Sequence, residues 1–110
     1  MTEYYVIRGD DEYSRQLNRQ AVYDVLDSLG YSPVDDFSYA SSDNNIQLTS
    51  VKSDRFGNYG SGEPTDTITA ISVTAFTADR TIVVALLRRI AENVNWMLID
   101  DESGEILYQP

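Results

Sequence analysis

The fold is decided by residues 67–99, TITAISVTAFTADRTIVVALLRRIAENVNWMLI. Residues 67–76 are rich in β-branched side chains, which is typical of a strand. Asp79 is placed to cap a helix, and residues 96–99 predict a buried strand. Between them, apolar residues recur every three or four positions and form one broad stripe: Ile82, Val83, Leu86, Leu87, Ile90 and Val94. The stretch therefore predicts a strand, a helix and a second strand.

The N-terminal part of the chain predicts a similar pair of elements. Residues 4–8, YYVIR, predict a strand that stops at Gly9. From about residue 14 to residue 29, apolar side chains repeat at helical spacing. Gly30 follows, at the position where a left-handed residue commonly ends a helix. We therefore expect a strand followed by a helix here as well.

The rest of the chain completes the predicted order. We expect an ordered loop at 31–45, a strand at 46–53, a long hairpin loop at 54–66 and a short closing strand at 106–108. The order is then β-α-β-β-α-β with a C-terminal β-hairpin, which is typical of a ferredoxin-like α+β fold. In this two-layer sandwich, two helices cover one face of an antiparallel sheet of four to five strands. A permuted α+β sandwich is the alternative.

Length and composition predict one domain spanning residues 1–110. The chain has 110 residues, of which 42% are hydrophobic, so it can build one ordinary core. It contains no cysteine, which fits a reducing cytoplasm. It has neither a signal-peptide pattern at Met1 nor an apolar run of about 18 residues. We therefore expect a soluble, unprocessed cytoplasmic protein.

The charge balance narrows the set of partners. Eighteen acidic residues stand against eight basic ones, giving a net charge of −10. Phosphate backbones and anionic lipids would be repelled, so we expect no direct nucleic-acid binding and no membrane binding. Solubility, or adaptation to high salt, explains the same charge equally well.

Catalytic, metal and cofactor sites are not expected. The chain lacks histidine and cysteine, and its single lysine, Lys52, is predicted on a strand, so no conventional activated nucleophile can be assembled. The glycines of 54–66 lie between strands, where no helix terminus would receive a phosphate. The acidic clusters lack the spacing of a calcium loop. An enzyme that uses Asp and Tyr is kept as a third hypothesis.

The predicted topology places the 31–45 loop, the start of the second helix and the C-terminal turn at one end of the molecule. Acidic residues dominate this end, with only Arg80 nearby, and two loop tyrosines are candidate interface anchors. The predicted partner-binding residues are Tyr31, Asp35, Asp36, Tyr39, Asp43, Asp79, Asp100, Asp101, Glu102 and Glu105.

This distribution predicts a protein that works by binding. The leading hypothesis is a small acidic inhibitor, such as the immunity protein of a bacterial toxin or a phage-encoded inhibitor. It would engage a basic partner protein, either a toxin or a nucleic-acid-processing enzyme, through the acidic end. The alternative is an assembly subunit that forms a homodimer through an edge strand or a sheet face. Residues 67–76 motivate the alternative, because their apolar residues fall on both faces of the predicted strand.

Overall fold

The computed structural model describes residues 2–10, 14–52, 66–76 and 79–110. In this part of the chain, two helices accompany nine strands. The helices are α1 (Arg19–Ser28) and α2 (Arg80–Val94), and the strands are β1 (Glu3–Arg8), β2 (Leu17–Asn18), β3 (Ser32–Pro33), β4 (Ser38–Ala40), β5 (Ile46–Val51), β6 (Thr67–Ile68), β7 (Ala70–Ala75), β8 (Met97–Asp100) and β9 (Ile106–Tyr108).

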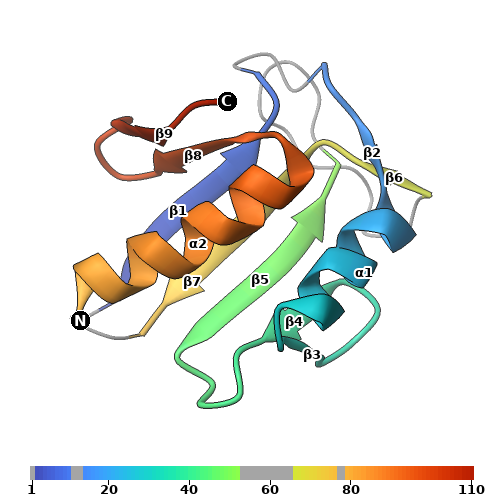
Figure 1. The fold of residues 1–110 in the computed structure, drawn as a ribbon, viewed down its shortest axis with the longest axis horizontal. Coiled ribbons are helices and arrows are strands. Elements are labelled where there is room, and N and C mark those ends of the chain that lie inside the picture. The colour runs from blue at the N-terminus through green and yellow to red at the C-terminus, as the bar shows by residue number, and fades with distance from the viewer. Residues whose placement is uncertain (1, 11–13, 53–65, 77–78) are drawn as a thin grey trace.

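Seven of the strands form one antiparallel sheet in the order β3-β4-β5-β7-β1-β8-β9, and β2 pairs with β6 in a separate ribbon. Both helices lie over the same face of the large sheet (Figure 1). The predicted α+β class, with two helices and an antiparallel sheet, is therefore confirmed.

The predicted strand count and element order are wrong in detail. Instead of four to five strands, the described residues build seven in the main sheet and two in the ribbon. Two of the additional strands, β3 and β4, lie within the 31–45 segment that we expected to be a loop. They have two and three residues, too few to show a period of two in a polar sequence. Pairing with β5, in which Tyr39 lies opposite Leu48, draws this segment into the sheet.

Two other element boundaries differ from the prediction. Helix α1 begins at Arg19 rather than near residue 14, because the Asn18 side chain caps it by accepting a 3.0 Å hydrogen bond from Ala21 N–H. Leu17, which we expected on the helix, pairs with Ile68 in the ribbon. The predicted strand at 67–76 is divided at Thr69 into β6 and β7. This division explains why Ile68 lies in the same core as Ile71 and Val73, whereas Ala70 faces the opposite side of the sheet.

Helix α2 forms as predicted. The Asp79 carboxylate accepts a 3.2 Å hydrogen bond from Ile82 N–H, which confirms the predicted cap. Asn95 ends the helix in the left-handed conformation, with φ of 59°. The following Trp96 is fully buried in the core between the helices and the sheet. A smaller apolar cluster, Val6, Ala70, Met97 and Ile99, is buried separately from this core.

The long hairpin loop predicted at 54–66 lies outside the described residues, apart from Asp66. In the part of the chain that is described, neither helix is long and apolar enough to cross a membrane.

Candidate partner-binding site

One end of the large sheet gathers acidic side chains. Glu3 of β1 lies opposite Ala75 of β7, which in turn lies opposite Ile46 of β5. Asp101 N–H donates a 3.0 Å hydrogen bond to the carbonyl of Tyr4, so the β8–β9 turn joins the same end. This turn and the start of α2 lie together at the left of Figure 1. We call the following seven residues the acidic end: Glu3, Asp43, Asp79, Asp100, Asp101, Glu102 and Glu105.

Asp100 is the most buried of these acids. Its carboxylate lies 2.8 Å from the Arg80 guanidinium and also accepts hydrogen bonds from the backbone N–H groups of Glu102 and Ser103. Burial alone would raise the pKa of Asp100, but the hydrogen bonds from Arg80 and from the turn outweigh it, so the pKa is lowered. Asp100 therefore holds the β8–β9 turn onto the start of α2.

Tyr5 and Glu3 extend this cluster across β1. The Tyr5 hydroxyl donates a 2.5 Å hydrogen bond to the Glu3 carboxylate, and the Arg80 guanidinium lies 5.7 Å from the centre of the Tyr5 ring. Burial of the hydroxyl, together with its bond to Glu3, raises the pKa of Tyr5 to about 12. The phenol is therefore neutral at physiological pH.

Asp43 is fixed by the β4–β5 turn. Its carboxylate accepts a 2.6 Å hydrogen bond from the Ser41 hydroxyl and bonds of 3.0 and 3.2 Å from the backbone and side chain of Asn45. The bonds from Ser41 and from the Asn45 N–H lower the pKa of Asp43. The charge at this position is therefore held in one place before any partner arrives.

Asp101, Glu102 and Glu105 are the most available acids of the end. All three are exposed, and the Glu105 side chain is 64% exposed and 3.8 Å from the Arg80 guanidinium. The carboxylates of Asp101 and Glu102 have no hydrogen-bond partner among the described residues. Asp101 and Glu102 can therefore contact a partner without breaking an internal interaction, and Glu105 would give up only its long, exposed ion pair with Arg80.

Asp35 and Asp36 lie elsewhere. The carbonyl of Asp36 accepts a 2.7 Å hydrogen bond from the Tyr23 hydroxyl of α1, and the carbonyl of Phe37 accepts one from Ser50 near the end of β5. Asp43 lies beside the start of β5, so the 31–45 segment spreads its acids over both ends of that strand. The two acids therefore sit beside α1 rather than in the acidic end.

Tyr31 and Tyr39, predicted as interface anchors, lie in the core, where they are 8% and 5% exposed. The ring centre of Tyr39 is 4.9 Å from that of Tyr23. Burial, and then a hydrogen bond with Asp27, raises the pKa of Tyr39 to about 12. The segment around each tyrosine looked polar in the sequence, but pairing into β3 and β4 turns the rings inward.

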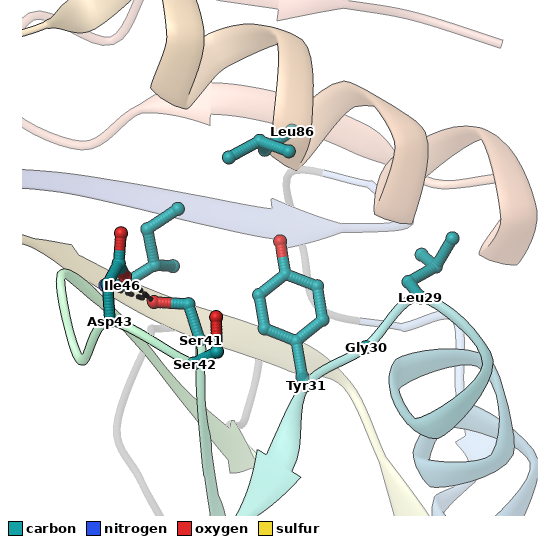
Figure 2. A pocket seen from close by; sticks show the side chains of 8 residues that line it. All are labelled: Leu29, Gly30, Tyr31, Ser41, Ser42, Asp43, Ile46 and Leu86. Atoms are coloured by element: carbon teal, nitrogen blue, oxygen red, sulfur yellow. Dashed lines mark hydrogen bonds between the residues drawn. The ribbon is translucent and has the colours of Figure 1, made fainter.

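Sequence reasoning missed a pocket of about 200 Å³ beside the acidic end. It lies between α2, the C-terminal end of α1 and the β4–β5 turn (Figure 2). Leu86 of α2 lines it and is 37% exposed, and Ile82, one turn earlier on the helix, is 56% exposed. The sequence did carry a signal for this exposed apolar side of α2. The apolar stripe of the helix is wider than the part that contacts the core.

Comparison of the sequence with protein-family models and with curated proteins found no match. Within the described residues, no three acidic side chains converge in a way that could hold a metal ion.

Proposed function

We propose that this chain is a small acidic inhibitor, of the immunity, antidote or phage-encoded type, that binds a basic partner protein through the acidic end. The observation that carries the proposal is the gathering of seven carboxylates at one end of the sheet. Among the described residues, Arg80 lies within that end, where Asp100 pairs with it, and Arg89 lies near Tyr31 at its margin. The end therefore presents a large excess of negative charge.

The cost of assembling these charges supports a binding role. Like charges held close together destabilise a folded chain, yet they concentrate a potential that steers an oppositely charged protein into contact. The lowered pKa of Asp43 and of Asp100 keeps both residues ionised at neutral pH. Asp101, Glu102 and Glu105 are the residues that we propose to contact the partner, and the internally bonded acids hold the surface in shape.

The partner that fits such a surface is a protein with a basic active site or a basic nucleic-acid groove. Regular phosphate-like rows of acids are not required for this fit, because an acidic turn can occlude a basic cleft directly. The inhibitor would compete with the anionic substrate of its partner.

Affinity capture from cells that carry the gene tests the proposal. The acidic-end variant combines Asp101→Asn, Glu102→Gln and Glu105→Gln. The control variant combines Asp24→Asn, Asp36→Asn and Asp66→Asn, which change the same number of exposed acids away from that end. Each variant changes the net charge from −10 to −7, since three negative charges are removed. We expect the wild type and the control variant to capture a basic protein that the acidic-end variant loses. Equal capture by all three proteins would contradict the proposal.

The sheet face opposite the helices supports the second candidate, a self-associating subunit. Tyr4 and Ile106 are exposed large side chains on this face, beside the paired and already buried Val6 and Ile99. Edge pairing has weaker support, because β3 contains Pro33 and has two residues, and β9 has three. A dimer whose mass in light scattering does not change with salt, and which Ile106→Lys dissociates, would favour this candidate over the inhibitor.

The ferredoxin-like plan is also retained as a proposal, for the centre of the sheet alone. The neighbour order β5-β7-β1-β8 of the four longest strands supports it. The other five strands would then be additions to that plan.

A further inference from the structure

The pocket beside the acidic end contains the hydroxyl of Tyr31. Tyr31 is 8% exposed, and its hydroxyl points into the pocket toward α2 (Figure 2). No described residue hydrogen-bonds with this hydroxyl. The hydroxyl oxygen is not among the buried side-chain atoms that lack a partner, so it is the part of Tyr31 that opens onto the pocket. The hydroxyl is therefore available to a hydrogen-bonding group from another molecule.

The second polar element of the pocket is an anion. The Asp43 carboxylate lines the pocket and is held by the bonds from Ser41 and Asn45 described above. One of its oxygens accepts only the 3.2 Å bond from the Asn45 side chain, so it has room for a further donor. A carboxylate fixed in this way binds a cation without the cost of ordering a mobile side chain.

The walls of the pocket are aliphatic. Leu29, Ile46 and Leu86 line it, and Ile82 continues the apolar surface along α2. An aliphatic wall next to a carboxylate matches a side chain with a long hydrocarbon stem and a charged head. The volume of about 200 Å³ is below the roughly 300–1,000 Å³ of pockets that hold whole small molecules. It therefore fits one side chain better than a metabolite.

We infer that this pocket receives the side chain of a lysine or arginine from the basic partner, with its stem against Leu86 and its head between the Tyr31 hydroxyl and the Asp43 carboxylate. This inference rests on the proposed function for the identity of the partner. Asp43 belongs to both the acidic end and the pocket, so a partner steered to that end arrives with its basic side chains next to the pocket.

Arg89 opposes such a ligand. Arg89 lies three residues after Leu86 on α2. Burial raises the pKa of the Tyr31 hydroxyl, the positive charge of Arg89 lowers it, and the negative charge of Asp43 raises it. Arg89 is therefore close enough to Tyr31 to repel a cation bound there. Removing the charge of Arg89 should strengthen the binding of a cation in the pocket. If the pocket instead bound anions, the same change would weaken their binding.

The preference of the pocket for cationic over neutral or anionic ligands can be measured without the partner protein. The full chain is titrated with n-butylguanidinium and n-butylammonium at constant ionic strength, followed by the amide NMR signals of Tyr31, Asp43 and Leu86. n-Butanol and n-butyrate serve as the neutral and anionic probes. We expect saturable shifts with both cations only. Saturable binding of butyrate, equal shifts with butanol, or the absence of saturable shifts would overturn the inference.

Three substitutions sharpen this test. Asp43→Asn should weaken binding of the two cations by about fivefold or more, and Tyr31→Phe by about two- to threefold. Arg89→Gln should strengthen it by about twofold. Asp35→Asn, in a turn beside α1, should change nothing. Cation binding that is unaffected by Asp43→Asn would overturn the inference; if that variant does not fold, unchanged binding in both Tyr31→Phe and Arg89→Gln would do so.

The pocket and the proposed function can fail separately. Loss of capture in the acidic-end variant, together with no cation binding in the pocket, would remove the pocket inference and leave the proposed function standing. Cation binding in the pocket, with equal capture by the acidic-end and control variants, would support the pocket and contradict the proposed function.

Discussion

Asp100 and Glu105 are neighbours of the same arginine, yet their surroundings make them very different acids. The Asp100 side chain is 12% exposed and 2.8 Å from Arg80, whereas the Glu105 side chain is 64% exposed and 3.8 Å away. Water screens the exposed pair, and exposed ion pairs contribute roughly 0–1 kcal/mol. Removing the charge of the largely buried Asp100 costs more, because Arg80, whose side chain is 40% exposed, loses its charged hydrogen-bond partner.

Asp100→Asn should therefore lower the free energy of unfolding by about 1–2 kcal/mol at pH 7, and Glu105→Gln by less than about 0.5 kcal/mol. Urea denaturation followed by the fluorescence of Trp96 measures both.

The contribution of Asp100 to stability should also depend on pH. Because the pKa of Asp100 is lowered in the folded state, its stabilising effect is present above the unfolded pKa of about 3.9 and is lost as the pH falls through the folded pKa. The difference between Asp100→Asn and the wild type should thus shrink below about pH 4. Equal costs for the two variants, or a difference that persists through the acid range, would contradict this assignment.

The tyrosines show where the burial of single residues could not be predicted from the sequence. Tyr31 and Tyr39 stand among polar residues in the sequence, so nothing local marks them as buried. Their burial depends on β3 and β4 pairing into the sheet, which is a tertiary effect. By contrast, Trp96 follows the long apolar stripe of α2, and its burial was predictable from its neighbours.

At the level of elements, Asp79 combines two roles that substitution can separate. Its carboxylate caps α2 and adds to the acidic end. Asp79→Ala should lower the free energy of unfolding by about 1 kcal/mol, because it leaves backbone donors of the first turn without the cap. Asp79→Ser retains a capping oxygen and should cost only a few tenths of a kcal/mol, from the lost charge at the helix N-terminus. Thermal unfolding of the two variants checks this, and equal destabilisation by both would show that the charge rather than the cap stabilises the helix.

The elements that were predicted well are those with long or strongly apolar patterns. Helix α2 has 15 residues with one continuous stripe, and β5 alternates buried and less buried residues. The errors lie in short elements. Two-residue strands such as β2 and β3 carry no measurable period, and the start of α1 is set by one hydrogen bond that the Asn18 side chain accepts from Ala21 N–H.

For the whole molecule, the strand topology concentrates part of the negative charge of the chain at one end of the sheet. The sequence places acids along the entire chain, and the pairing of β1 with both β7 and β8 brings Glu3, Asp79 and the β8–β9 turn to one end. Sequence reasoning found most of this end because it depends on the strand order at the centre of the sheet. It misplaced Asp35 and Asp36, because their position depends on the β3–β4 hairpin.

The most direct test of the central claim is the association rate of the chain with its captured basic partner, measured by stopped flow at increasing sodium chloride concentration. At low salt, the acidic-end variant should associate about tenfold more slowly than the wild type, while the control variant stays close to the wild type. The rates of all three should converge as salt screens the charges, and dissociation rates should differ less. Association rates that are equal for the three proteins and do not depend on salt would contradict the claim that the acidic end steers a basic partner.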